Sequence, residues 1–389
     1  MVPMRGTLQT TKQPHVPLGG LTSATFLRRH WQKRPLFVRN ALPHCGDWLS
    51  ANSLFALAAR DEVESRLVMR ARGRWSVQHG PFTRSQLRSL PAQGWTLLVQ
   101  GMEQHQPEAA ALLQQFSFIP HARLDDLMVS YAPPGGGVGP HFDSYDVFLL
   151  QGAGTRRWRI SAQKNLVLDE HAPLRILKQF KPAQEWITEH GDLLYLPPRH
   201  AHDGVAQSTC MTLSVGFRAP RKLELAQRFL EYVQDNLRES QFPGLYEDRD
   251  LDRDVQVQKH PAAVSSALLE KMARILKPVR WNESDIRRFA GCYLTEPKAQ
   301  TVFQAPRRPA TLPEFTRRVA AKGVRLALPT RMLFHGGHVF INGESHALPA
   351  ADRAALIHLA DRRAVPACTP SAAGAHLLHA WYCAGYLEV

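Results

Sequence analysis

The chain has 389 residues, of which 44% are hydrophobic, and a formal net charge of +14 at pH 7. A chain of this length can form two or three domains with substantial packed cores. It contains no run of 18 apolar residues and no long apolar segment in its first 20, so we expect neither a membrane-spanning helix nor a secretory signal. Its five scattered cysteines lack Cys-x-x-Cys spacing and indicate reduced thiols in a cytoplasmic protein, not a disulfide framework or a zinc site.

We expect residues 1–20 to form a flexible tail and residues 21–220 to form a catalytic barrel with a helical lead-in. Thr22 is placed to cap the first helix, and Leu36–Val38 follows a proline as a short strand. The later strand-like runs are separated by glycine and proline at a spacing typical of an all-β sandwich or barrel. These runs are Met128–Tyr131, Asp146–Leu150, Trp158–Ile160, Leu193–Leu196 and Met211–Phe217.

Two segments of this region, Gly135–Asp143 and Gly191–His202, together predict a metal site. Side chains two apart on a strand share a face, so His141 and Asp143 point the same way. A lone His-x-Asp pair is usually a hydrogen-bonded pair in a loop, and the second segment is what favours a metal. With His202 the pair forms a 2-His-1-carboxylate set with open positions, which is typical of non-haem Fe(II) oxygenases.

Two other residues are weaker candidates for this site. His200 lies two residues from His202 and could replace it as a ligand, but the spacing from Pro197 favours His202. Asp146 lies five residues after His141, on the opposite face of the predicted strand. It is therefore a weaker ligand, and an alternative role for it is to help seat a substrate.

One strand-like run carries an arginine on its apolar face. Arg156 shares that face with Trp158 and Ile160. An uncompensated buried charge is strongly destabilising, and the planar guanidinium suits a carboxylate bidentately. In an iron pocket this anion would be the distal carboxylate of 2-oxoglutarate. A structural ion pair with Asp146 or Asp169 is the alternative.

These segments carry a family resemblance. The second, a Gly-x5-Pro sequence followed by histidine, is similar to the second cupin motif, and the whole resembles the JmjC branch of the cupin superfamily. The likeness is closest to the bacterial ribosomal oxygenases, and it covers more than half of the chain. One departure is Arg199, where the cupin pattern has glycine, which leaves the shape of that turn open. The matching segments are Arg28–Pro35, Asp125–Tyr131, Gly135–Gly152, Arg156–Arg159 and Ser214–Pro220.

The resemblance implies a fold, a metal and a reaction. The fold is a mainly β catalytic domain, the double-stranded β-helix of cupin and JmjC proteins. His141, Asp143 and His202 would hold Fe(II), and 2-oxoglutarate with O2 would be converted into succinate and CO2 while a C–H bond is hydroxylated. The implied substrate is an arginine side chain, hydroxylated at Cβ, of a large-subunit ribosomal protein. The sequence does not indicate which protein, which arginine or which acidic or aromatic groups select it.

The resemblance also assigns the cosubstrate site. Arg156 matches the arginine that binds 2-oxoglutarate in the family. Ser130 and Thr212 stand where polar cosubstrate contacts are expected. Ser130 is the stronger candidate of the two, because close members of the family more often have an amide at the position of Thr212.

After Pro220 the spacing of apolar residues becomes helical. Residues 221–285 are predicted to form a helical region, with a first helix that ends near Asn236, an acidic connector at Glu247–Asp252 and a second helix at Val264–Leu276. These helices have apolar faces but no core of their own, so they need something to pack on. A second copy of the chain is the simplest candidate, and the resemblance also implies a homodimer through this region.

Residues 286–389 are predicted to form a winged-helix-like α+β domain, as the family also has. The Gly336-Gly337 turn between short β runs is a hairpin signal. Winged helices often bind DNA, but a fold does not confer that function, so a protein-contact or structural role is favoured here. The expected elements are helices Pro313–Ala321, Asp352–Leu359 and Ala375–Tyr382 and strands Val324–Leu328, Met332–Phe334 and Val339–Ile341.

Three other functions compete with ribosomal arginine hydroxylation. One is a different JmjC-type protein hydroxylase or demethylase. Another is a small-molecule metal cupin, although such cupins commonly use a more histidine-rich ligand set and have no need of Arg156. The third is a basic nucleic-acid binder, because a positive field favours encounter with RNA. That last function leaves the metal-type residues unexplained, and the charge equally fits a solvated basic surface. Nucleic-acid contact is thus compatible with the sequence but not required by it.

Overall fold

The computed structural model describes residues 17–238, 240, 257, 260 and 262–389. Most of the predicted tail and the predicted connector Glu247–Asp252 lie outside these residues. The chain divides into two compact units. The first contains Met1–Ala219, Pro297–Arg331 and Pro349–Val389, and the second contains Pro220–Glu296 and Met332–Leu348.

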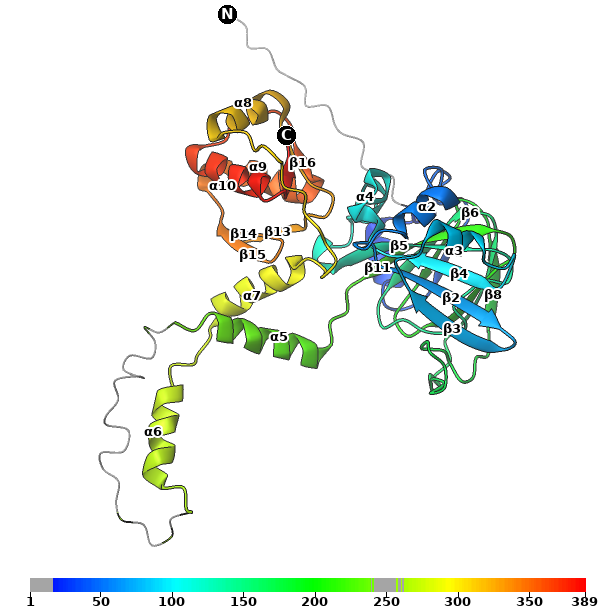
Figure 1. The fold of residues 1–389 in the computed structure, drawn as a ribbon, viewed down its shortest axis with the longest axis horizontal. Coiled ribbons are helices and arrows are strands. Elements are labelled where there is room, and N and C mark those ends of the chain that lie inside the picture. Colours follow the sequence, from blue (N-terminus) through cyan, green and yellow to red (C-terminus); the bar gives the residue numbers. More distant parts are fainter. Residues whose placement is uncertain (1–16, 239, 241–256, 258–259, 261) are drawn as a thin grey trace, which may run out of the picture. The chain divides into compact units, whose positions relative to one another are not determined.

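The first unit is built on a large antiparallel sheet (Figure 1) with the strand order β1-β9-β6-β11-β5-β4-β2-β3. A second, three-stranded sheet has the order β10-β7-β8. The strands of the large sheet are β1 Leu36–Val38, β2 Ser65–Ala71, β3 Arg74–His79, β4 Trp95–Val99, β5 Leu124–Ala132, β6 Val147–Ala153, β9 Leu193–Leu196 and β11 Cys210–Phe217. Those of the small sheet are β7 Arg156–Ser161, β8 Gln184–Thr188 and β10 Ala201–Ala206.

The two sheets pack on each other through a small apolar cluster. From β6 it takes Val147 and Leu149, and from β7 it takes Trp158 and Ile160. A Cβ added at Gly204 on β10 would lie 2.5 Å from the Trp158 ring, so glycine is needed for this close approach. The mainly β double-layer predicted for this region is therefore confirmed, and its five predicted strands all form, with ends that differ by a few residues.

The other face of the large sheet is covered by N-terminal helices. Helix α1 (Ser23–Arg29) is capped by Thr22, whose hydroxyl accepts from the backbone N–H of Thr25 at 3.2 Å, as predicted. The fully buried Phe26 of this helix packs edge-on against Tyr195 of β9, with ring centroids 4.9 Å apart. Three further helices, which the sequence did not predict, are α2 Ala51–Leu57, α3 Arg84–Arg88 and α4 Pro107–Gln114.

The C-terminal residues supply the predicted helices and hairpin. In the first unit lie α8 Leu312–Lys322, α9 Arg353–Arg362 and α10 Ala372–Cys383, together with the short strands β12 Val324–Leu326, β16 Ala364–Val365 and β17 Leu387–Glu388. In the second unit lie β13 Met332–His335 and β14 His338–Ile341, joined by the predicted glycine turn, and a third strand, β15 Glu344–Ala347.

The second unit also contains the helices α5 Lys222–Asp235, α6 Ser266–Leu276 and α7 Glu283–Thr295. The apolar side chains of α5 and α6 remain largely exposed in the single chain, including Leu230 at 57% and Leu276 at 60%, whereas Phe289 of α7 is buried. None of the helices in the described part of the chain is long and apolar enough to cross a membrane.

Candidate metal centre

His141, Asp143 and His202 meet in the first unit. Each offers one ligand atom, and these three atoms lie within 4.8 Å of one another. Among the described residues, no other group of three or more metal-type side chains is this close. A short antiparallel bridge fixes the two histidines, because each backbone N–H donates to the other residue's carbonyl, at 2.9 and 2.8 Å.

Hydrogen bonds set the tautomer of both histidines. Nδ1 of His141 lies 2.9 Å from the carbonyl of Gly139, and Nδ1 of His202 lies 2.9 Å from the carbonyl of His200. A carbonyl only accepts, so each Nδ1 carries the proton and each Nε2 keeps its lone pair. Burial and the nearby His141 lower the pKa of His202 to about 4, so this imidazole is neutral near pH 7.

The turn before His202 keeps its shape although it lacks the family's glycine. Arg199 adopts a left-handed backbone with φ of 63°, a conformation that normally favours glycine. Its N–H donates to the carbonyl of Asp143 at 2.7 Å and so ties the turn to the other metal-type segment. The imidazole of His200 is absent from the close group, and this residue contributes its carbonyl instead.

Asp146 does not take part in the metal group. Its carboxylate is fully buried and accepts from the Tyr195 hydroxyl at 2.6 Å and from the Gln32 amide at 3.1 Å. It therefore fastens the N-terminal segment to β9, and it is used by the fold rather than by a ligand or substrate.

Arg156 lies on the buried face of β7 without an anionic partner. It is 3% exposed, and its side-chain hydrogen bonds are long ones from Nη2 to Ser130 Oγ (3.4 Å) and Cys210 Sγ (3.6 Å). Its guanidinium carbon also lies 5.7 Å from the centroid of the Trp158 ring. Its Nε has no partner. No ion pair recorded between described residues joins it to Asp146 or Asp169. A buried guanidinium left in this state calls for a carboxylate.

A polar network surrounds Arg156. Thr212, which is buried like Ser130, donates to the amide oxygen of Gln151 at 3.1 Å. Thr188 stands 3.0 Å from that same oxygen and 3.0 Å from the carbonyl of Arg156. Gln151 was not predicted as a site residue, although a buried amide at the end of the apolar run of β6 was a signal that could have revealed it.

Acidic and aromatic side chains lie next to the metal group. The charge of Asp143, followed by burial and the charges of Asp126 and Asp125, raises the pKa of the 39%-exposed Tyr145. A Cβ built on Gly216 would lie 3.6 Å from Asp126 Oδ1 and 3.9 Å from Tyr145 Cε2. This acidic pair and the tyrosine were not predicted individually, because they come together only across three strands.

The residues present fit Fe(II) and a dicarboxylate. Two imidazoles and one carboxylate match the donor set of non-haem iron oxygenases. The unpaired guanidinium of Arg156, beside the Ser130 hydroxyl, matches one end of a dicarboxylic acid. The chemistry of the donors and the unpartnered buried cation thus point to the same two groups.

Comparisons with known proteins agree with this geometry. A JmjC domain model matches residues 111–225, and a model of the ROXA-like winged helix matches residues 278–388. The chain is 36% identical to the ribosomal protein uL16 3-hydroxylase of Escherichia coli over 88% of this chain and 89% of that protein. It is 40% identical to a probable ribosomal oxygenase of Haemophilus influenzae over 51% of this chain and 50% of that protein.

A solved structure covers nearly the whole chain. The ribosomal oxygenase YcfD of Escherichia coli, in complex with cobalt and 2-oxoglutarate, superposes with a TM-score of 0.77 at 32% identity. The superposition covers 95% of this chain and 98% of that one. The winged-helix likeness and the JmjC fold predicted from the sequence are both confirmed. The chain belongs to the JmjC-domain ribosomal oxygenases.

Proposed function

We propose that this protein is an Fe(II)- and 2-oxoglutarate-dependent oxygenase that hydroxylates an arginine side chain of the large-subunit ribosomal protein uL16 at Cβ. The observation that carries the proposal is the buried Arg156, which has no anionic partner among the described residues. It lies on β7, which pairs with β10, the strand that carries His202 of the metal group. Together the metal group and Arg156 can bind a metal and a dicarboxylate. A metal cupin without a dicarboxylate cosubstrate has no need of this arginine. The named activity of the Escherichia coli relative supplies the substrate class.

Each residue has a distinct task in this proposal. His141, Asp143 and His202 hold the iron, with both histidines oriented through their Nδ1 hydrogen bonds. Arg156 and Ser130 hold the distal carboxylate of 2-oxoglutarate. Bound iron with 2-oxoglutarate and O2 supplies the oxidising chemistry, and the protein's part is to place one C–H bond beside it.

The acidic and aromatic rim favours a cationic substrate side chain. Asp126 is buried next to the exposed ring of Tyr145, and Asp125 adds a second carboxylate. Lys298 pairs with both carboxylates, so a substrate guanidinium would share them with this lysine. A guanidinium donates paired hydrogen bonds to a carboxylate and packs against the face of a tyrosine ring. The net charge of +14 repels a basic protein at long range, so such short-range contacts have to provide the selectivity.

We also propose the domain roles predicted from the sequence. Residues 21–220 carry catalysis, residues 221–285 form a homodimer, and residues 286–389 serve in protein contact or structure. The exposed apolar faces of α5 and α6, with Leu223 at 70% and Leu269 at 55% exposure, support the dimer. A ribosomal substrate and unpaired cysteines support a cytoplasmic location. No nucleic-acid contact is needed for any of these roles.

The test is a reaction of purified enzyme with Fe(II), 2-oxoglutarate and uL16, followed by mass spectrometry of the peptides. We expect one arginine of uL16 to gain one oxygen atom while succinate forms in equal amount. Release of formaldehyde, or turnover of methyl-lysine peptides alone, would show a demethylase instead. Metal-dependent activity that does not require 2-oxoglutarate would point to a small-molecule cupin.

A further inference from the structure

One imidazole of the metal group is oriented by the residue two positions before it. Nδ1 of His141 donates to the carbonyl of Gly139 at 2.9 Å, so the direction of this carbonyl sets the orientation of the ring. Gly139 is buried and has a left-handed backbone with φ of 80°. Whatever holds the backbone of Gly139 in place therefore also holds the ring of His141.

Two side chains close the space beside Gly139. A Cβ built on this residue would lie 2.8 Å from Cζ2 of Trp75 and 3.3 Å from Cδ1 of Ile176. Both distances are shorter than the optimal separation of two carbon atoms, so both side chains pack directly on the glycine backbone. Trp75 lies on β3 and Ile176 lies between β7 and β8, so the contact joins three distant segments of the chain.

Residues 175–177 make further contacts with the segment that carries the metal ligands. The N–H of Leu177 donates to the carbonyl of Pro140 at 2.8 Å. The guanidinium carbon of Arg175 lies 5.5 Å from the ring centroid of Phe142, which stands between two of the ligands in the sequence. The backbone is therefore held on both sides of the first ligand by the same short stretch of chain.

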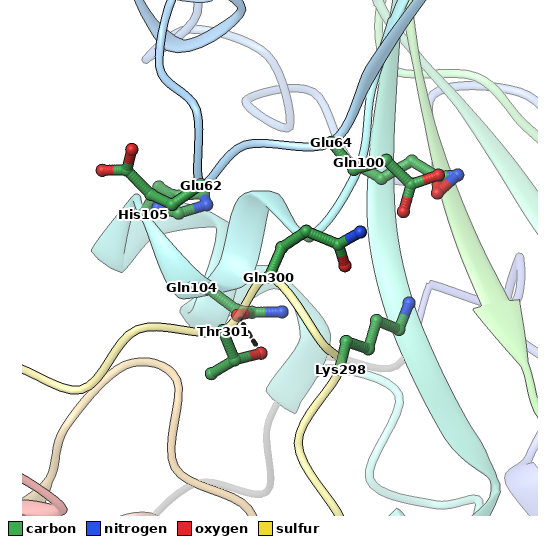
Figure 2. A pocket seen from close by; sticks show the side chains of 9 residues that line it. Glu62, Glu64, Gln100, Gln104, His105, Lys298, Gln300 and Thr301 are labelled. Carbon is green, nitrogen blue, oxygen red and sulfur yellow. Dashed lines mark hydrogen bonds between the residues drawn. The ribbon is translucent and has the colours of Figure 1, made fainter. Parts of the chain in front are cut away.

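Both supports of Gly139 are themselves fixed. The carbonyl of Ile176 accepts from the N–H of Asp169 at 2.8 Å, so this stretch is paired within its own loop. The strand of Trp75, β3, is the last strand of the large sheet and pairs with β2 along its whole length. The start of β2 is joined to the end of β4, where the N–H of Gln100 donates to the Glu64 carbonyl at 2.9 Å, and Figure 2 shows these two residues side by side.

We propose that Trp75 and Ile176 are positioning residues for the metal, because they fix the carbonyl of Gly139 and through it the imidazole of His141. The inference rests on the metal site of the proposed function but not on its substrate. The other imidazole has a different support, since His202 is part of strand β10, whereas His141 has only the short bridge to that strand. Neither supporting side chain offers a ligand atom to a metal, so both act through the glycine backbone.

The test measures Co(II) binding to the metal-free protein by competition with a coloured chelator, at a temperature where each variant is folded. Trp75→Ala opens the space beside Gly139, and we expect its dissociation constant for Co(II) to rise about tenfold, as when a group that orients a metal ligand is removed. Ile176→Val removes the one methyl group that reaches Gly139 and should cause a smaller rise. The visible absorption of bound Co(II), which depends on the arrangement of its ligands, should change in both variants.

Matched controls separate positioning from general stability. Val77→Ala shortens the next half-buried side chain of β3, and Ile119→Val removes the same methyl group from the main core of the first unit. Ile119→Val should lower the melting temperature of the metal-free protein about as much as Ile176→Val does. Both controls should keep the Co(II) affinity and absorption of the wild type.

The outcomes distinguish this inference from the proposed function. Wild-type Co(II) affinity and absorption in Trp75→Ala and Ile176→Val overturn the inference, and if Trp75→Ala does not fold, Ile176→Val decides alone. An equal loss of affinity in the controls also overturns it. Co(II) binding by the wild type without hydroxylation of any uL16 peptide removes the proposed substrate but leaves this inference standing. A wild type that binds no Co(II) removes the metal centre and the inference with it.

Discussion

Replacing Arg156 tests the cosubstrate site through two properties, the free energy of unfolding and the affinity for 2-oxoglutarate. We expect the replacement to leave the first unchanged or higher and to lower the second. The side chain is 3% exposed, its Nε has no partner, and its Nη2 contacts are 3.4 Å or longer. In the enzyme without cosubstrate, this buried cation costs stability and returns little through hydrogen bonds. Arg156→Met keeps most of the volume and removes the charge. We therefore expect its free energy of unfolding to equal or exceed that of the wild type.

The same variant should bind 2-oxoglutarate poorly. A charge-assisted hydrogen bond contributes about 1.5–3 kcal/mol, so KM for 2-oxoglutarate should rise roughly ten- to a hundredfold. In thermal unfolding, 2-oxoglutarate should stabilise the wild type by an amount that grows with the logarithm of its concentration above Kd, and it should leave the variant almost unchanged. Arg157→Met, on the opposite face of β7, is the control and should keep the wild-type affinity.

Two results would refute this reasoning. If Arg156→Met unfolds at a markedly lower temperature, the arginine has a structural anionic partner and the cation is not waiting for a ligand. If KM for 2-oxoglutarate stays at the wild-type value, the cosubstrate carboxylate is held elsewhere.

Four further predictions concern the metal turn, the pH dependence and the assembly. His202→Ala should abolish iron binding, measured by metal analysis, and succinate formation, while His200→Ala should keep both; the reverse result would exchange the two ligands. Arg199→Gly should relieve the left-handed backbone, which costs an L-residue about 1–2 kcal/mol, and raise the melting temperature at equal activity; a lower melting temperature would show that the arginine side chain supports the turn. Burial, then the charge of Asp126, raises the pKa of Glu103 from 4.5 to about 7. The folded state thus holds this proton more tightly than the unfolded chain, and the stability it provides is complete below pH 4.5 and is lost as the pH rises through 7. Denaturant titration gives the difference in free energy of unfolding between pH 5 and pH 8, and Glu103→Gln should change this difference by on the order of 2 kcal/mol. If the difference is the same in the variant and the wild type, Glu103 does not titrate in this range. Leu230→Asp should convert a dimer into monomers, as measured by light scattering. A wild type that is monomeric at micromolar concentration would contradict the predicted dimer.

The residues of the candidate site were predictable where the signal is local. His141 and Asp143 are two apart, and the strand period alone places them on one face. The same period places Arg156 on the apolar side of β7, and the burial of this residue in the structure agrees with that. His202 followed from the spacing after a proline turn. These predictions needed no knowledge of which strands pair.

The residues that were missed depend on pairing between distant parts of the chain. Lys298 meets Asp126 across 172 positions of sequence, and no local pattern announces that contact. Glu64 and Gln100 become neighbours because β2 pairs with β4, in a region for which no strand was predicted. The backbone of Arg199 shows a different limit of prediction from sequence. This residue is left-handed in the turn, but nothing in the sequence distinguishes it from an ordinary surface arginine.

The charges of the protein change sign along the path from the metal centre outward, and this order explains how it can use both an anionic cosubstrate and a basic substrate. Innermost, Arg156 is a buried cation that needs a carboxylate. At the rim, Asp126 is a buried anion beside Tyr145. Next to it, Lys298 pairs with Asp126 and Asp125. The surrounding surface belongs to a chain with a net charge of +14, and salt screens this outer field beyond about 8–10 Å. The outer field thus disfavours the encounter with a basic protein, while the carboxylates at the rim favour a basic side chain once the substrate has arrived. It follows that substrate selectivity resides in contacts made after the encounter, at the rim, and that changes there act on the lifetime of the complex more than on its rate of formation.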